Sequence, residues 1–242
     1  RESLWHTGIL LKSLQYVESF KSLIINSSRD LYLSKDGQVN EGLNSTLNGM
    51  KGIPEVAETM AIQRDLEVLR YTGGRLHFSL ISAAKSVDLI KAAKKEGLKV
   101  TCDVGVHYLI LTDDVIGEFD SNHKVLPPFR TEEDRRALIA GVKSGVIDCV
   151  VSDHTPIDEE CKKLEFDYAE FGITGQEVLY SLLADVLTLD ELVQQLACGP
   201  RMVLGLPLSS IAVGEDANFT LFAANEEWDY KETYSKSKNN PF

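Results

Sequence analysis

This 242-residue sequence has no long apolar run and no clustered cysteines. No stretch approaches the ~18 uninterrupted apolar residues of a membrane-spanning helix, and residues 1–6 do not read as a secretory signal. The four cysteines, Cys102, Cys149, Cys161 and Cys198, are far apart and form no C-x-x-C pair, which argues against a zinc ribbon and a redox motif. We therefore expect a cytoplasmic protein with reduced thiols.

Positive charge is also scarce. The sequence has 25 Lys and Arg residues against 37 Asp and Glu residues, for a net charge of -12. Binding to a phosphate backbone needs a clustered positive field, so neither a nucleic-acid partner nor a membrane partner is predicted. A hydrophobic content of 43% with 26% charged residues is typical of a globular protein with a sizeable core.

Several motifs of common enzyme classes are absent. No G-x-G-x-x-G occurs, so Gly172 and Gly175 are interpreted as turn and close-packing residues rather than as a phosphate-binding loop. No G-x-S-x-G occurs either, which disfavours Ser152, or Ser79 with His77, as a nucleophile. There are only five histidines, and none is followed by a second one two residues later.

What the sequence does contain is a regular alternation of helices and strands. Short apolar stretches predict strands over residues 22–26, 75–81, 98–106 and 147–152. Amphipathic patterns predict helices over residues 2–20, 53–71 and 86–95 and a further helix that ends at Gly145, and residues 36–52 are predicted to form a long loop. This order indicates parallel βα units, and four strands make half of an eight-stranded barrel.

The pattern changes near the end of the chain. A helix is predicted from Asp190 to Ala197, then a β segment over residues 217–222, and the polar tail from Ser235 is expected to fray. We divide the chain into barrel-type units over residues 1–205 and a return to a small β domain, with the tail, over residues 206–242.

The strand predicted before Ser152 ends in the polar side chains of Asp153 and His154. The carboxyl ends of parallel strands carry the functional groups of α/β proteins, so Asp153 is a candidate acid, base or metal ligand. The alternative is a structural carboxylate that accepts backbone N–H groups. His154 and His107 are candidate ligands of a rearranged site or structural hydrogen-bonding groups, and residues 158–160 are expected to be a solvated acidic loop.

Ordered motifs give a resemblance to a known family. The sequence carries PP-x-R-x-x-x-D over residues 127–134 and Asp-His-x-Pro over 153–156, with further matching segments at 52–58, 171–177 and 213–218. It resembles the dihydroorotases of the multifunctional-complex type, within the amidohydrolase superfamily. The resemblance implies an α/β fold: the C-terminal half of a (β/α)8 TIM-like barrel plus a short terminal β segment of the small amidohydrolase β domain.

The same resemblance shows where the chemistry has changed. Members of the family open or close a cyclic amide with a zinc-bound hydroxide, and Asp153 falls on the family's last-strand Asp ligand. Leu80 and Ser27 occupy positions where the family has ligating histidines. Two substrate-contact positions are also changed, to Leu126 and Ile157. A catalytic zinc generally needs three protein ligands, so no metal site and no cofactor are predicted, and Asp153 remains as the retained catalytic position.

Three functions follow as hypotheses. The first is a dihydroorotase-like pseudoenzyme of pyrimidine biosynthesis that has lost zinc and acts as an assembly partner, for example of aspartate transcarbamoylase. The second is an active zinc-dependent dihydroorotase, a cyclic amide hydrolase converting dihydroorotate to carbamoyl aspartate, whose front half lies outside these 242 residues and supplies the other ligands. The third is a metal-independent module for a small acidic metabolite, although Leu126 and Ile157 disfavour a dicarboxylate.

The predicted half-barrel also implies an association. The strand over residues 22–26 would have an open parallel edge, which proteins rarely leave uncovered. Either a front half or another chain covers that edge, and a homodimer is the expectation from the resemblance.

Overall fold

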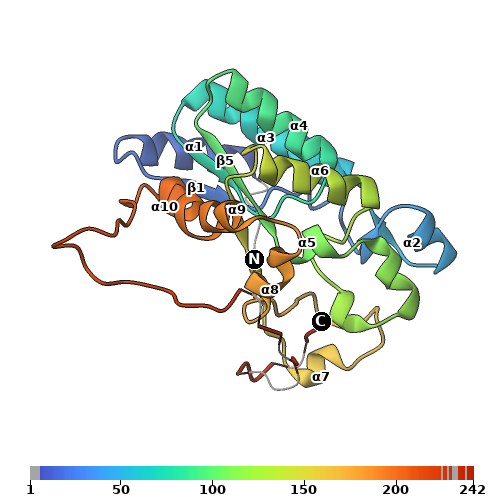
Figure 1. The fold of residues 1–242 in the computed structure, drawn as a ribbon. Helices are drawn as coiled ribbons and strands as arrows, with labels where there is room; N and C mark the ends of the chain where they lie inside the picture. Colours follow the sequence, from blue (N-terminus) through green and yellow to red (C-terminus); the bar gives the residue numbers. More distant parts are fainter. Residues whose placement is uncertain (1–5, 225, 228, 231–233, 238) are drawn as a thin grey trace.

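The centre of the molecule is a four-stranded parallel sheet, shown in Figure 1. The computed structural model describes residues 6–224, 226–227, 229–230, 234–237 and 239–242. The strand order is β1-β4-β5-β6, from β1 (Ile24–Asn26) through β4 (Leu76–Phe78) and β5 (Val100–Gly105) to β6 (Cys149–Val151). Each strand lies inside its predicted range, and the predicted fold class is confirmed.

Four long helices cover one side of this sheet. They are α1 (Thr7–Glu18), α3 (Val56–Thr72), α4 (Ala84–Lys95) and α6 (Glu132–Lys143). Successive helices contact one another, α1 with α3, α3 with α4, and α4 with α6. The row lies along the upper part of Figure 1. Each helix returns the chain to the start of the next strand, so the strand ends point in one direction.

The other elements are short. Between β1 and α6 they are β2 (Val39–Asn40), α2 (Leu43–Leu47), β3 (Gly52–Ile53), α5 (His107–Ile110) and the 3-10 helices Asp113–Glu118 and Ser121–His123. After β6 they are α7 (Glu159–Lys162), α8 (Leu179–Ala184), α9 (Leu189–Val193), a π-helical turn (Gln194–Cys198) and α10 (Gly199–Leu204).

The prediction of one long loop over residues 36–52 was wrong, because this segment contains the short elements β2, α2 and β3. Strands β2 and β3 pair in parallel, and Val39 is buried against Ile116 and Phe166 in a second small apolar cluster. Two-residue strands are too short to show an alternating pattern, so the pairing could not be seen in the sequence.

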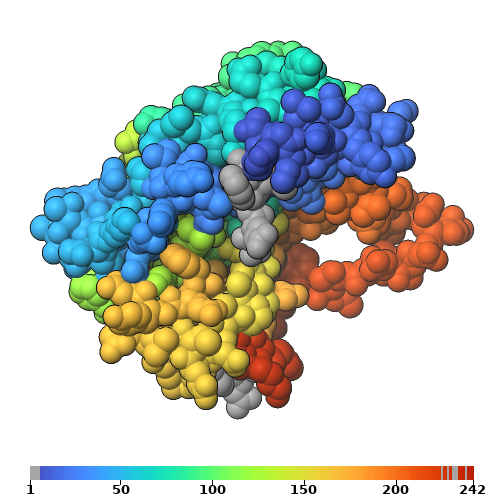
Figure 2. All heavy atoms as spheres, turned by 180° about the vertical axis from the view of Figure 1, so that it is seen from behind, coloured from blue at the N-terminus to red at the C-terminus, as the bar shows by residue number. Residues whose placement is uncertain are grey.

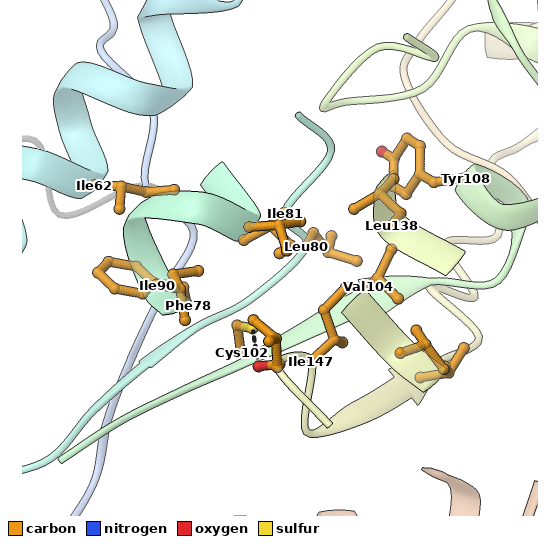
Figure 3. Close-up of a cluster of buried hydrophobic side chains, with 14 of the residues drawn as sticks. Ile62, Phe78, Leu80, Ile81, Ile90, Cys102, Val104, Tyr108, Leu138 and Ile147 are labelled. Carbon is orange, nitrogen blue, oxygen red and sulfur yellow. Dashed lines mark hydrogen bonds between the residues drawn. The ribbon is translucent and has the colours of Figure 1, made fainter. Parts of the chain in front are cut away.

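The main apolar core lies between the sheet and the helix row. It combines Leu10 and Leu14 of α1 with strand residues such as Phe78 and Cys102, all of them almost fully buried. Figure 3 shows part of this cluster, with Ile90 of α4 beside Phe78. Close packing of this kind is what fixes the positions of the strand ends.

The end of the chain departs from the prediction in two ways. Residues 217–222 form no strand, and the segment 206–222 stands away from the body, as the orange and red spheres of Figure 2 show. The tail is not frayed where it is described. The Ser235 N–H donates to Glu177 (2.8 Å), the Thr174 N–H donates to the carbonyl of Asn239 (3.0 Å), and Asn239 is fully buried. A strand needs a neighbouring edge for its hydrogen bonds, and residues 217–222 have none within the described chain.

Strand β1 forms one end of the sheet and pairs only with β4 within the described chain. The side chain of Ile25 is 54% exposed there. This agrees with the open edge expected for half a barrel. Among the described residues, none of the helices combines the length and the apolar character that crossing a bilayer requires.

Candidate functional site

The four strand ends bring the sequence-predicted positions to one edge of the sheet. Ser27 follows β1, Leu80 follows β4 by two residues, His107 follows β5, and Asp153 follows β6 by two residues. Parallel strands place their carboxyl ends side by side, so this edge is the candidate site.

Asp153 is held in a strained conformation. Its backbone has φ 45°, in the left-handed region, and the residue is 7% exposed. The Thr155 hydroxyl donates to its carbonyl (3.2 Å) and lies 3.5 Å from its Oδ1, while Oδ2 lies 3.7 Å from Nε2 of the fully buried His107. A non-glycine residue at positive φ persists only when its surroundings fix it, so the carboxylate has a defined direction.

A cavity of about 120 Å³ opens beside this carboxylate. Its walls are formed by Ser27, Arg29, Val125, Leu126, Asp153, Thr155, Phe171 and Gly172. The cavity therefore joins two predicted positions, Ser27 and Asp153, with Leu126 at a predicted substrate-contact position. Arg29 belongs to the polar run that follows the first predicted strand, but no pattern in the sequence assigned its side chain a role in the site.

Leu80 belongs to the core rather than to a ligand set. Its side chain is 2% exposed and is part of the main apolar cluster, and Figure 3 shows it beside Ile81 and near Val104. Its backbone has φ 59°, and its N–H donates to Oδ1 of Asp103 at 2.7 Å. An aliphatic side chain has no lone pair, so this strand end offers no ligand to a metal.

The buried pair of His77 and Asp103 is structural. The His77 ring contacts Oγ1 of Thr101 through Nδ1 (2.8 Å) and Oδ2 of Asp103 through Nε2 (2.9 Å), so both ring nitrogens are engaged. The Ser79 hydroxyl lies 3.4 Å from Asp103 and is not bonded to this ring. The structure therefore does not assemble a nucleophile from Ser79 and His77.

The remaining strand-end groups also make backbone contacts. The Ser152 hydroxyl accepts the N–H of His154 (3.4 Å), and Nδ1 of His154 accepts the N–H of Gln176 (3.4 Å). The main chain of His154 forms a bridge with Ile173. These contacts fit the structural interpretation of His154. The acidic residues 158–160 are exposed as expected, although part of this segment forms α7 rather than a loop.

Gly172 and Gly175 are close-packing residues, as predicted. A Cβ on Gly172 would lie 2.6 Å from Cγ1 of Ile157, and one on Gly175 would lie 2.6 Å from the carbonyl of Ser152. Both separations are shorter than any tolerated contact, so only glycine lets the segment after Phe171 approach the β6 end. Ile157 thus supports the cavity wall through Gly172.

Two buried lysines, also missed in the sequence, brace this wall. Nζ of Lys162 donates to the carbonyls of Lys124 (3.2 Å), Glu170 (2.8 Å) and Gly172 (2.9 Å). Nζ of Lys124 donates to the carbonyl of Phe166 (2.7 Å) and lies 5.0 Å from the centre of the Phe171 ring. Burial, followed by the charge of Lys124, lowers the pKa of Lys162 to about 8, and burial also lowers that of Lys124.

The donor set present does not fit a catalytic zinc. Within the part of the chain that the structure describes, no group of three or more His, Cys, Asp or Glu side chains gathers as a metal site. Nε2 of His107 lies 3.7 Å from Oδ2 of Asp153, and the strand ends after β1 and β4 carry a hydroxyl and an aliphatic side chain. Three protein ligands are the general requirement, so these residues alone do not hold the ion.

Sequence comparison shows that the chain is similar to dihydroorotases. The chain is 38% identical over 246 residues to the dihydroorotase of Endomicrobium trichonymphae, covering 98% of this chain and 58% of that protein. It is 39% identical over 243 residues to the dihydroorotase of Thermoanaerobacter sp. (strain X514), covering 97% of this chain and 56% of that protein. The chain therefore spans a little over half the length of these relatives. No family model matches the sequence.

Structure comparison gives the same superfamily. The L-hydantoinase (dihydropyrimidinase) of Arthrobacter aurescens superposes with a TM-score of 0.76 at 27% identity, over 87% of this chain and 50% of that one. The D-hydantoinase (dihydropyrimidinase) of a Thermus species gives a TM-score of 0.74 at 20% identity, over 87% and 50%.

A parallel βα array with its polar groups at the strand ends, superposing on these enzymes, defines an amidohydrolase-superfamily fold. Within that superfamily, the chain is a relative of the dihydroorotases.

Proposed function

We propose that this chain is part of a dihydroorotase-like protein of pyrimidine biosynthesis that has lost its zinc centre and acts through its surface. The observation that carries the proposal is the burial of Leu80, 2% exposed, in the apolar core at a strand end where the resemblance expects a ligating imidazole. Ser27 at the neighbouring strand end supports it, because a neutral hydroxyl is a poor zinc ligand beside histidine.

Loss of zinc removes the nucleophile. Bound zinc lowers the pKa of a water molecule to about 7, and without it very little hydroxide forms near neutral pH. Asp153 can still accept a proton, but a general base needs a nucleophile to activate.

The test uses the intact protein that contains this chain. We expect metal analysis to find no stoichiometric zinc, and the cyclisation of carbamoyl aspartate to proceed at background rate. In the Asp153→Asn variant both values should stay unchanged, because Asp153 then holds no ion. Stoichiometric zinc and turnover in the wild type, both lost in Asp153→Asn, would refute the proposal.

The second candidate is an active zinc-dependent dihydroorotase. One observation favours it: the chain spans only 58% of the length of its relative, so the rest of a longer protein has room to supply ligands. The Asp153→Asn comparison separates the two candidates directly, since only an active metal centre would respond to it.

For the surface role we propose assembly with aspartate transcarbamoylase. Support comes from exposed apolar side chains near the start of the described chain, Tyr16 (71% exposed) and Phe20 (61%) of the α1 region and Ile25 (54%) of β1. Exposed apolar area of this kind is typical of contact surfaces. Sedimentation of the intact protein, alone and mixed with purified aspartate transcarbamoylase, should show a joint species. If the protein sediments as a homodimer both alone and in the mixture, the proposed assembly with aspartate transcarbamoylase is contradicted.

A further inference from the structure

Asn239 is fully buried although its side chain is an amide. A buried amide is costly unless both of its ends make hydrogen bonds. Both ends do so here, with main-chain groups of the segment that follows β6. Nδ2 donates to the carbonyl of Thr155 (2.9 Å), and Oδ1 accepts the N–H of Ile157 (3.2 Å). The amide has one defined orientation, because exchanging its oxygen and nitrogen would face donor with donor and acceptor with acceptor.

These two contacts follow the pattern of a parallel neighbouring strand. In a parallel pair, one residue donates to a carbonyl of the next strand and accepts the N–H found two positions later on that strand. The Asn239 side chain makes both contacts across Pro156, which itself has no N–H. Residues 155–157 belong to no helix or strand, so this side chain supplies contacts that regular secondary structure would otherwise give.

The main chain of Asn239 reaches a second segment of the same wall. Its carbonyl accepts the N–H of Thr174 (3.0 Å), which follows Gly172 by two residues. Thr155 and Gly172 both line the cavity beside Asp153. Asn239 therefore ties together the two segments that carry these wall residues.

Thr155 is the link between Asn239 and the carboxylate of the site. Its hydroxyl donates to the carbonyl of Asp153 (3.2 Å) and lies 3.5 Å from Oδ1 of the same residue. Asp153 has φ 45°, a conformation that persists only when the surroundings fix it. Loss of the Asn239 donor frees the Thr155 carbonyl, so the contact that helps to hold Asp153 loosens as well.

We infer that Asn239 is a positioning residue of the candidate site: its amide fixes Thr155 and Ile157, and through Thr155 it sets the direction of the Asp153 carboxylate. Asn239 is not among the residues that line the cavity, so it acts through these neighbours. The inference is independent of whether the intact protein holds zinc, because every contact it uses lies within the chain.

NMR of the histidine rings in the intact protein tests the effect on the carboxylate. Nε2 of His107 lies 3.7 Å from Oδ2 of Asp153, so the ring signals of His107 report the position of this carboxylate. In Asn239→Ala they should shift from their wild-type values. The ring of His77, which contacts side chains of β5 instead, should keep its signals. Unchanged His107 signals, or equal shifts of both rings, would overturn the inference.

Hydrogen exchange followed by mass spectrometry tests the effect on the segment. Asn239→Ala removes the donor to Thr155 and one of two acceptors of the Ile157 N–H, which also meets the Ser237 hydroxyl (3.1 Å). Residues 155–157 should then exchange about tenfold faster, equivalent to ~1.4 kcal/mol, while exchange in α3 stays unchanged. An equal increase throughout the protein, or none in residues 155–157, would contradict the positioning role.

The neighbouring Asn240 gives a matched control. Its Oδ1 accepts the N–H of Phe242 (3.1 Å), a contact within the tail itself. Asn240→Ala removes the same amide group one residue later, and it should leave the His107 signals and the exchange of residues 155–157 at their wild-type values. Effects as large as those of Asn239→Ala would overturn the inference, because they would belong to the tail as a whole.

Asn239→Asp covers the case in which the alanine variant does not fold. Aspartate has nearly the same shape and keeps an acceptor for the N–H of Ile157, but its carboxylate cannot donate to the carbonyl of Thr155. With folding confirmed by circular dichroism, the loss of this one donor should shift the His107 signals. Wild-type His107 signals in a folded Asn239→Asp protein would rule out positioning by Asn239.

Discussion

At the scale of single residues, Leu80 lies at the strand-end position where the resemblance expects a ligating histidine. A leucine at φ 59° is sterically unfavourable, and the conformation persists because the surrounding contacts fix it. The N–H of Leu80 donates to buried Asp103, and its side chain fills part of the apolar core. The hydrogen bond to Asp103 and the core packing therefore fix the position of Leu80.

Shortening this side chain tests its core role. Leu80→Ala should lower the free energy of unfolding by about 2–4 kcal/mol, because buried methyl groups are lost and a void remains. The control is Leu43→Ala on α2, where the side chain is 72% exposed, and it should change the value by less than ~0.5 kcal/mol. Urea unfolding measures both. Equal effects of the two variants would show that Leu80 does not pack as described.

Lys162 gives a residue-level dependence on pH. Its pKa is about 8 in the folded protein against 10.5 for the ordinary side chain, because burial and then the charge of Lys124 disfavour the ammonium form. Between these two values the unfolded chain binds more protons, so the contribution of Lys162 to stability rises with pH. Below about 8 both states are protonated and the contribution is flat.

Comparing the stability of the wild type with that of the Lys162→Met variant isolates the pH-dependent contribution of Lys162. We expect the variant to be less stable overall, since the carbonyls of Lys124, Glu170 and Gly172 lose their donor. The diagnostic result is the difference in stability between wild type and variant, which should grow as pH rises from about 8 towards 10.5. A difference that stays constant over this range would contradict the lowered pKa.

At the scale of elements, α6 has the clearest local signal. Thr131 and Asp134 form a reciprocal cap in which the Asp134 N–H donates to the Thr131 hydroxyl (3.4 Å) and the Thr131 N–H donates to Asp134 (3.1 Å). Oδ1 of Asp134 also accepts the Ala84 N–H at the start of α4 (2.8 Å). One carboxylate thus fixes the first turns of two neighbouring helices.

Removing the Thr131 cap of α6 should lower the free energy of unfolding. Thr131→Ala is expected to cost about 1 kcal/mol of unfolding free energy, because a first-turn N–H loses its acceptor. Thr131→Ser keeps the hydroxyl and should retain most of that stability. Equal losses for the Ala and Ser variants in urea unfolding would rule out the cap as the source.

Most elements could be predicted because their signals are local. The strands before Ser27, Ser79, Val106 and Ser152 are mostly apolar and the helices between them are periodic, so their order followed from the sequence. β2 and β3 could not be predicted, since their pairing joins two residues with two others across α2. The same applies to residues 234–237 and 239–242, whose hydrogen bonds reach back to the segment 155–177.

The candidate site could be predicted only in part for the same reason. Asp153 was located by its strand-end position, which the local pattern defines, whereas Ser27 and Leu80 were located only through the resemblance to the dihydroorotases. Arg29 and the lysine pair were not, because each acts through contacts with residues far away along the chain, such as the carbonyl of Phe166 on Lys124. The sequence shows which side chains exist but not which distant carbonyls they meet.

At the scale of the whole molecule, the chain divides into a packed body and one projecting segment. Residues 206–222 carry many exposed apolar side chains, among them Ile211 (88%), Val213 (108%) and Leu221 (96%). Residues 234–237 and 239–242 lie against the body beside the cleft, where Asn239 donates to the carbonyl of Thr155 (2.9 Å). The final segment is thus tied to the cavity wall although a long projection precedes it.

Limited proteolysis of the 242-residue chain should reveal this arrangement. Chymotrypsin should cut first within residues 206–222, because this part is extended and exposed and offers Leu and Phe side chains to the enzyme. The two fragments should still elute together in gel filtration, since Glu177 accepts the N–H groups of Tyr234 and Ser235 and thereby retains the C-terminal piece. They should separate only in denaturant. First cleavage within residues 36–52 would show that residues 206–222 are not the most accessible segment. Release of the C-terminal fragment under native conditions would show that the tail is not bound to the cleft wall.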